Sequence, residues 1–255
     1  MIVLKSERDL RVMREAGRIL AAVLARLEET VQPGVTTAAL EAEADRMIRA
    51  AGATATFRGQ AGLVSHAPPY PAATCISVNE QVIHGIPGAR VVRNGDVVSI
   101  DCGVTYRGLI ADSAITVIAG DGSAASRRLV DATRRALDAA IGAAKAGGHL
   151  HDISFAVQAV AMSEGFGVVR EFCGHGVGRD LHEDPPVPNY GNPGTGPVLR
   201  PGMTLAIEPM ITAGSPKIKV LKDGWTVVTE DGRPSAHFEH TIAITSGAAE
   251  VLTLR

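Results

Sequence analysis

The stretch Val97–Ser113 reads VVSIDCGVTYRGLIADS, and we predict two strands joined by a tight turn. The β-branched run before Asp101 has strand composition, and Tyr-Arg-Gly is a turn signal. A two-residue loop at 106–107 would pair Asp101 with Asp112, whereas one at 107–108 would place them diagonally. Both registers put the two carboxylates on one face. An odd-length loop would put them on opposite faces unless a bulge intervened.

Two like charges set in apolar strands are costly, because they repel and because burial disfavours both ionised forms. A shared proton, an Arg or Lys side chain, or a metal ion would offset that cost. The alternative for the hairpin taken alone is a solvated tip with two surface aspartates.

Composition limits the function classes. The chain has 255 residues, 45% of them hydrophobic and 20% charged, with a net charge of −2. This length suits one large domain or two small ones. The chain has no basic block, so nucleic acid is not an expected partner. No apolar run approaches a membrane span, and the N-terminus does not resemble a signal peptide. The three cysteines indicate free thiols in a reducing cytoplasm.

Hydrophobic periodicity predicts an α+β fold built from a repeated unit. Helices are expected over 7–29, from Thr36 or Thr37 to about 51, over 123–145, and from about 153 to 165. Ser6 and Asp9 form the expected capping box of the first helix. Besides the hairpin, the predicted strands are 74–78, 81–84, 168–172, 204–210, 225–229, 240–245 and 251–254, and 58–71 is a predicted loop. Similar helix–break–helix spacings predict one domain with duplicated halves, 1–120 and 121–255.

Further polar residues stand in or beside apolar strands of the second half. A lone Glu at a strand end is usually a surface residue, and a lone His among glycines is usually a loop residue. Taken together, however, the set has four carboxylates and one imidazole: Asp101, Asp112, Glu208, Glu239 and His175. Two divalent cations would neutralise four negative charges. Oxygen-rich ligation with one His suits Mn, Fe, Co or Zn, and does not suit a closed structural zinc site.

Five motifs occur in an order that resembles type I methionine aminopeptidase. They are CISVNEQVIHGIP (75–87), SID (99–101) with ADS (111–113), GHGVGRDLHEDP (174–185), IEP (207–209) and FEHT (238–241). The resemblance runs nearly end to end. It implies the pita-bread fold, two related halves around a dinuclear metal site. No zinc-finger extension precedes the motifs, and the interval from Glu208 to Glu239 is too short for the type II insertion, so we expect the short bacterial form.

The resemblance implies a role for each site residue. Asp112 and Glu239 would bridge two metal ions, Asp101 would complete one shell, and His175 and Glu208 the other. A bridging water or hydroxide would attack the scissile carbonyl of an N-terminal methionine that precedes a small residue.

The remaining roles concern the substrate. His182 would hydrogen-bond the peptide carbonyl and the developing oxyanion, His84 would contact the scissile amide nitrogen, and Glu208 would also shuttle a proton.

The resemblance also implies a methionine pocket and a monovalent-cation site. The pocket residues would be Tyr70, Cys75, Leu181 and Trp225, and the cation would lie near Asn79, Gln81 and Ser235. Two positions depart from the family. Leu181 stands where an aromatic residue is common, which implies a looser pocket. His237 stands where Gln is frequent, two residues before the ligand Glu239, which implies altered hydrogen bonding there.

Three alternatives are left open. Trp225 could anchor a loop instead of lining the pocket. The chain could be another pita-bread peptidase, such as an X-Pro aminopeptidase or a prolidase, although these typically carry a further N-terminal domain and a different histidine pattern. It could also be a non-catalytic relative, although such proteins lose ligands. The expected partner is the N-terminal peptide of a nascent protein, the expected state a monomer, and transient ribosome association is left open.

Overall fold

The structure is a computed structural model that describes residues 1–62 and 67–254, so part of the predicted loop 58–71 lies outside the described residues. The helices found there are α1 (Glu7–Thr30), α2 (Thr37–Ala50), α3 (Ala124–Ala143) and α4 (Leu150–Ser163). All four were predicted, with small differences at their ends. The expected capping box of α1 is confirmed, since Ser6 and Asp9 bond each other's backbone N–H groups.

The strands divide between a large sheet and two small ones. The large sheet contains β1 (Thr54–Ala55), β2 (Thr74–Val78), β4 (Val97–Tyr106), β5 (Leu109–Ile118), β7 (Gly174–Gly176), β8 (Glu183–Val187), β9 (Thr204–Ile207), β14 (Glu239–Ala243) and β15 (Glu250–Val251). The small sheets contain β3 (Gln81–Ile83), β6 (Gly167–Val168), β10 (Met210–Thr212), β11 (Ile218–Val220), β12 (Val227–Thr229) and β13 (Ser235–His237).

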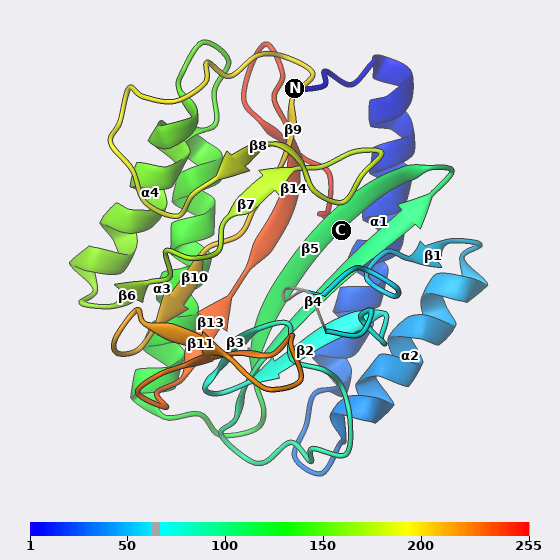
Figure 1. Cartoon of the computed structure of the whole chain (residues 1–255), viewed down its shortest axis with the longest axis vertical. Helices are drawn as coiled ribbons and strands as arrows, with labels where there is room; N and C mark the ends of the chain where they lie inside the picture. Colours follow the sequence, from blue (N-terminus) through cyan, green and yellow to red (C-terminus); the bar gives the residue numbers. More distant parts are fainter. Residues whose placement is uncertain (63–66, 255) are drawn as a thin grey trace.

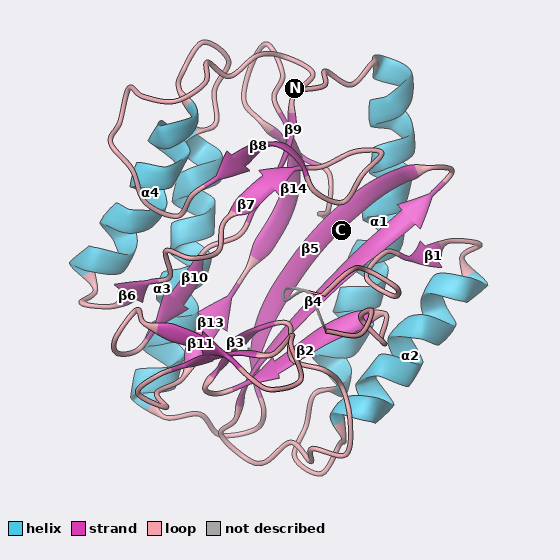
Figure 2. Cartoon of the chain, in the orientation of Figure 1, coloured by secondary structure: helices cyan, strands magenta, loops and turns pink. Residues whose placement is uncertain are grey.

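The large sheet runs in the order β1-β4-β5-β14-β9-β7-β8, with β2 on β4 and β15 on β14, and its paired strands are antiparallel. Figure 1 shows α1 and α2 beside the β4–β5 end and α3 and α4 beside the other end. Figure 2 shows the same helices flanking the strands. One apolar cluster joins α1 and α2 to β2 and β4, and a second joins α3 and α4 to β9 and β14. The α+β class is confirmed.

The register of the central hairpin is the second of the two predicted ones. Asp112 lies opposite Gly103, and Asp101 lies opposite Ala114. The turn residues Arg107 and Gly108 have φ values of +48° and +77°. Positive φ at both central positions matches the twist of the flanking strands, and Gly adopts it without steric cost. The alternative prediction, with the loop at 106–107, is therefore wrong by one residue.

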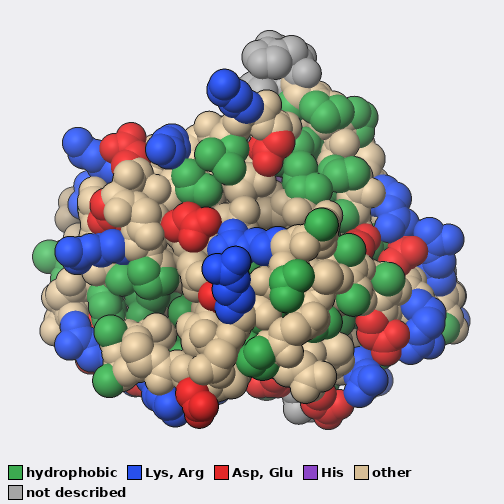
Figure 3. Space-filling model, turned by 90° about the horizontal axis from the view of Figure 1, so that it is seen from below, with side chains coloured by type: hydrophobic (Ala, Val, Ile, Leu, Met, Phe, Trp, Pro, Cys, Tyr) green, Lys and Arg blue, Asp and Glu red, His purple; other side chains and the backbone are tan. Residues whose placement is uncertain are grey.

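Other strand predictions needed correction. The predicted strand 204–210 is two strands, because Pro209 has no N–H for a ladder and the chain changes sheet after Glu208. The predicted 168–172 strand has only its first residue in β6, and the segment around His175 is strand β7 instead of a loop. Among the described residues, no helix is long and apolar enough to cross a membrane. The face seen from below mixes both signs of charge (Figure 3).

A glycine of α1 permits close contact with the C-terminal segment. A Cβ added at Gly17 would lie 1.9 Å from the carbonyl oxygen of Leu252. We predict that Gly17→Ala lowers the free energy of unfolding by about 1–3 kcal/mol, because backbone must shift to admit the methyl group. Chemical denaturation measures the change.

The matched control is Gly142→Ala near the end of α3, where an added Cβ meets nothing within 4 Å. This variant should be more stable by about 0.5–1 kcal/mol, because Ala loses less backbone entropy than Gly in a helix. Equal effects of the two substitutions would contradict the proposed packing of Gly17.

Candidate metal centre

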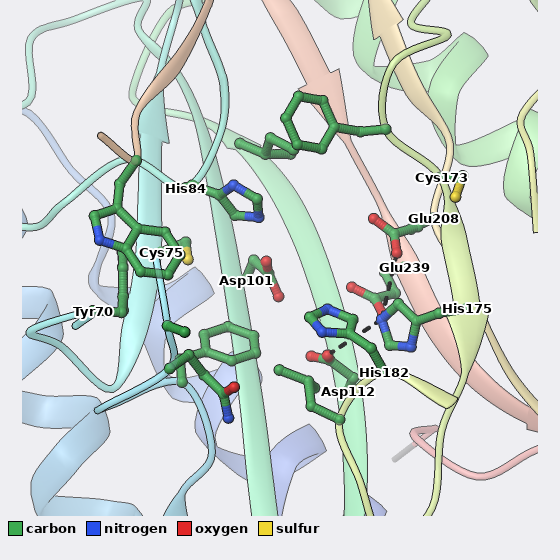
Figure 4. A pocket seen from close by; sticks show the side chains of 17 residues that line it. Tyr70, Cys75, His84, Asp101, Asp112, Cys173, His175, His182, Glu208 and Glu239 are labelled. Atoms are coloured by element: carbon green, nitrogen blue, oxygen red, sulfur yellow. Dashed lines mark ion pairs between the residues drawn. The ribbon is translucent and has the colours of Figure 1, made fainter. Parts of the chain in front are cut away.

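Strand register brings three carboxylates together on one face of the large sheet. Ala114 of β5 lies opposite Asp101 of β4 on one side and opposite Glu239 of β14 on the other. Asp112 is two residues from Ala114 along β5, so its side chain points to the same face. Figure 4 shows all three carboxylates pointing into one cavity.

The remaining two residues come from the next strands of the same sheet. Ala206 of β9 lies opposite Thr241 of β14 and opposite His175 of β7. Glu208 follows two residues after Ala206, which carries its side chain back to the same side. His175 Nε2 lies 3.6 Å from Glu208 Oε1 and 4.0 Å from Asp112 Oδ2. The five predicted residues are thus brought together (Figure 4).

Burial makes this group electrostatically unfavourable as it stands. Within the part of the chain that the structure describes, three carboxylate oxygens are buried without a hydrogen-bond partner: Asp101 Oδ1, Asp112 Oδ1 and Glu239 Oε1. Burial raises the pKa of Asp101 to about 8. Burial and the neighbouring carboxylates raise the pKa of Asp112, Glu208 and Glu239 well above their usual range. Within the described residues, no Lys or Arg forms an ion pair with any of the four.

The Nε2 atom of His175, which lies near the carboxylates, is an acceptor and not a donor. His175 Nδ1 lies 2.9 Å from the carbonyl oxygen of Gly176. Because a carbonyl oxygen can only accept a hydrogen bond, Nδ1 carries the proton and donates it. Burial lowers the pKa of His175 to about 4, so the ring is neutral and Nε2 carries a lone pair. Ligand atoms of Asp112, His175 and Glu239 lie within 4.8 Å of one another. The unpaired oxygens and this lone pair fit a divalent cation.

Two further histidines line the cavity, as expected. The His182 ring centroid lies 4.5 Å from that of His175. His84 adopts a left-handed backbone conformation with φ +58° and has a buried Nδ1 without a partner. Burial lowers the pKa of His84 to about 4, and burial also lowers the pKa of His182. Both rings are therefore neutral near pH 7, so each has one N–H donor and one acceptor nitrogen.

His237 lies behind the carboxylates. Its side chain is buried, and neither ring nitrogen has a hydrogen-bond partner among residues 1–62 and 67–254. Its Nε2 is 3.8 Å from Glu208 Oε2 and 3.9 Å from Glu239 Oε2. Burial lowers its pKa to about 3. His237, which stands where Gln is frequent in the family, therefore faces two of the candidate ligands.

The cavity as a whole holds about 350 Å³, and its lining includes all four predicted pocket residues, Tyr70, Cys75, Leu181 and Trp225. The Tyr70 and Trp225 rings meet edge-to-face with centroids 4.9 Å apart. Trp225 Nε1 donates to the carbonyl of Pro68 at 2.8 Å, so this residue both anchors a loop and lines the cavity. Lining residues that the sequence reasoning missed include Phe57, Gln60, Ile83, Phe172 and Cys173. Ile83 lies within the quoted motif 75–87 and Cys173 directly precedes the motif 174–185, so proximity to these motifs was the available signal for those two. Phe57, Gln60 and Phe172 carry no such signal.

Two neighbouring side chains point away from the candidate metal centre, and the three residues of the predicted monovalent-cation site lie together. Cys102 packs in the apolar cluster with α1 and α2, and His240 Nδ1 lies 2.8 Å from the Thr253 hydroxyl, so neither side chain faces the candidate metal centre. Asn79, Gln81 and Ser235 do meet, because the Ser235 hydroxyl donates to the carbonyls of Asn79 and Gln81 at 3.3 and 3.1 Å. The monovalent-cation site there stays a prediction.

Comparison with known proteins decides the family. The sequence model of metallopeptidase family M24 matches residues 11–246. The chain belongs to this family. The M24 chain is 47% identical over 253 residues to methionine aminopeptidase 1 of Bacillus subtilis, covering 99% of each chain. It is 48% identical over 254 residues to the methionine aminopeptidase of Clostridium perfringens, covering 100% of this chain and 99% of the other.

Solved structures agree with the family. The crystal structure of methionine aminopeptidase from Thermotoga maritima superposes with a TM-score of 0.96, at 44% identity and 100% coverage of both chains. The prolidase of Pyrococcus furiosus superposes with a TM-score of 0.77 at 20% identity, covering 99% of this chain and 66% of the other. The latter likeness shows the fold alone. The expected pita-bread fold and the stated family resemblance are confirmed.

The raised carboxyl pKa values predict a pH dependence of the metal-free protein. An unfolded chain releases the Asp101 proton near pH 4, whereas the folded protein holds it until about pH 8. Stability therefore falls as pH rises through this range. Neutral buried histidines such as His175 and His84 oppose the trend only below about pH 6.5.

We thus predict that, with a chelator present, Tm falls between pH 6.5 and 8. Each such proton contributes about 1.4 kcal/mol per pH unit. Saturating Mn²⁺ should flatten the dependence, because ligands bind metal in their deprotonated form. Thermal denaturation with and without Mn²⁺ measures both, and a Tm that rises with pH in chelator would contradict the prediction.

Proposed function

We propose that the protein is a metal-dependent aminopeptidase that removes the initiator methionine from nascent proteins when the second residue is small. The observation that carries this is the buried group of four carboxylates and one neutral imidazole at one end of an apolar cavity. Kinship to methionine aminopeptidases across the whole chain supports the substrate. A candidate metal centre beside an apolar cavity end matches both halves of the proposed reaction, the hydrolysis and the binding of a methionine side chain.

The metal set is proposed as two divalent ions of the Mn, Fe, Co or Zn kind. Asp112 and Glu239 would bridge them, with Asp101 completing one shell and His175 and Glu208 the other. The oxygen atoms without partners and the Nε2 lone pair of His175 support these assignments. When bound, such ions lower the pKa of water and polarise a carbonyl oxygen.

Protein side chains then orient the peptide and move protons. His182, neutral and facing the cavity, would donate its N–H to the scissile carbonyl and to the oxyanion that develops from it. His84 would contact the scissile amide nitrogen. Glu208, whose side chain lies among the other candidate ligands, would carry a proton from the attacking water to the leaving amine.

The apolar end of the cavity supports the methionine specificity. Cys75, Tyr70 and Trp225 are at least 95% buried and form an apolar wall, and Leu181 closes the wall with an aliphatic side chain. An unbranched thioether fits such a space better than a branched aliphatic side chain. We also propose a monovalent cation beside Asn79, Gln81 and Ser235, whose oxygen atoms converge.

The cellular setting is part of the proposal. Nascent chains are made in the cytoplasm, and all three cysteines are free thiols, as expected in a reducing compartment. We propose that the protein acts there as a monomeric single domain of two duplicated halves, 1–120 and 121–255, with transient ribosome association. The duplication is supported by the packing of one helix pair against each end of the large sheet (Figure 1).

Peptide cleavage tests the function. We predict that Met-Ala-Ser is hydrolysed with added metal and that chelator abolishes the reaction. Leu-Ala-Ser should react about 10- to 200-fold more slowly, the range of discrimination that an apolar pocket supplies. Ala-Pro-Ala should not be hydrolysed. Cleavage of this peptide alone would indicate an X-Pro peptidase. Full activity toward Met-Ala-Ser in excess chelator would refute metal dependence.

Two histidines should separate metal binding from chemistry. We predict that His182→Ala keeps its metal while kcat falls about 10²–10³-fold, the usual cost of one oxyanion donor. His175→Ala should bind metal weakly at one site and recover partly at high metal concentration. Mass spectrometry of metal content together with kcat and KM measures both. The matched control is Asp131→Ala, an exposed carboxylate on α3, which should keep full metal content. Equal metal loss by both histidine variants would contradict these roles.

A further inference from the structure

A buried ion pair joins the segment before α1 to the segment that carries His182. Lys5 Nζ lies 2.5 Å from Glu183 Oε2, and the two side chains are only 4% and 10% exposed. Lys5 Nζ also donates to the carbonyl of Val3 at 3.1 Å, and the Lys5 backbone N–H donates to Gly202 at 2.7 Å. Lysine is seldom buried without a partner, so the position of Lys5 depends on Glu183.

Gly178 creates the path that Lys5 takes to its partner. A Cβ at Gly178 would lie 2.1 Å from Lys5 Cε and 2.6 Å from Glu183 Oε1. Any side chain at this position would therefore exclude the lysine stem or displace the carboxylate. Glycine, without a Cβ, avoids both contacts, and the φ angle of Gly178 is not in the left-handed region, so backbone conformation does not by itself require glycine here. Its absent side chain is thus explained by the ion pair.

Glu183 uses its second oxygen to close the segment upon itself. Glu183 Oε1 accepts the backbone N–H of Arg179 at 2.7 Å, while Oε2 is held by Lys5. At the other end of the segment, the Gly178 carbonyl accepts the N–H of Ile110, on β5, at 2.8 Å. Residues 178–183 are therefore attached to the sheet at both ends, through Gly178 and through Glu183 at the start of β8, and the Glu183 side chain also attaches them to the N-terminal segment.

His182 depends on these attachments because its own ring has few. Among the described residues its imidazole makes no hydrogen bond, and its ring contact is with His175 at 4.5 Å. Next to it in the chain, Glu183 begins β8, and adjacent side chains of extended chain point to opposite sides. His182 consequently faces the cavity (Figure 4), while Glu183 points away from it and contacts Lys5.

We propose that Lys5 and Glu183 are positioning residues that hold His182 at the distance from the substrate carbonyl that catalysis needs. This inference rests on the proposed role of His182. Hydrogen-bonding groups act efficiently only when they are held in place before charge develops, and a misplacement of about 1 Å can cost about 10²-fold in rate. The N-terminal segment, although it does not line the cavity, is thereby part of the catalytic apparatus.

The test is a double-mutant cycle between Lys5→Met and His182→Ala. Met keeps an unbranched stem over Gly178 and removes the charge. Lys5→Met should lower kcat on Met-Ala-Ser about 10- to 100-fold, leave KM and metal affinity within twofold, and quicken amide hydrogen exchange over residues 178–183. In the His182→Ala background, the same substitution should change kcat less than twofold, because the group it positions is gone.

Two further variants separate positioning from loss of stability. Lys5→Met combined with Glu183→Gln leaves no unpaired buried charge and keeps an oxygen for Arg179, so Tm should recover while kcat stays low. Arg14→Met is the matched control, because Arg14 also joins α1 to a distant carboxylate, that of Glu250, at 2.6 and 2.8 Å. It should lower Tm without changing kcat.

The outcomes are distinguishable. Unchanged kcat in Lys5→Met, or equal losses in the presence and absence of His182, would overturn the positioning role. Recovery of kcat together with Tm in the double variant would also overturn it, and would assign the pair to stability alone. Unchanged kcat in His182→Ala would instead contradict the proposed function of that histidine.

Discussion

Four carboxylates buried on one face of a sheet impose the constraint on which this structure depends. Burial raises the pKa of each, and three of the four keep an oxygen without a hydrogen-bond partner. An isolated buried charge is costly enough that proteins neutralise, pair or ligate it. Because no Lys or Arg in the described part of the chain pairs with them, protons or cations must fill that role. The site is therefore a place where protons and metal ions compete.

The rest of the fold supplies rigid positions for these charges. Strand pairs set Asp101 and Glu239 on either side of Ala114, so their spacing follows from the sheet itself. Glycines flank His175 because β7 must fit between two neighbours. A Cβ at Gly174 would lie 2.3 Å from the Ala206 carbonyl, and one at Gly176 would lie 2.2 Å from the Asp184 carbonyl. Sites built on strands are held more precisely than sites on loops.

Groups around the cavity differ in how they are held. All the candidate ligands except Glu208 lie on strands of the large sheet, whereas the His182 side chain, just before β8, makes no hydrogen bond in the described chain. The placement of His182 depends on the buried ion pair between Glu183 and Lys5, which lies 178 residues earlier in the sequence. The candidate ligands and the proposed substrate-orienting histidine are thus held by different sets of contacts, so a change in one set need not disturb the other.

The sequence by itself determined the helices, the hairpin and the identity of the candidate ligands. Periodicity and caps are local, and apolar strands interrupted by carboxylates are visible in any single chain, so Asp101, Asp112 and the family motifs could be recognised without coordinates. Only the tertiary structure decided the hairpin register and the change of sheet at Pro209, which depend on backbone φ values and strand partners. It alone placed His237 against two carboxylates and Lys5 against Glu183, because burial and long-range pairing arise only when distant segments pack together.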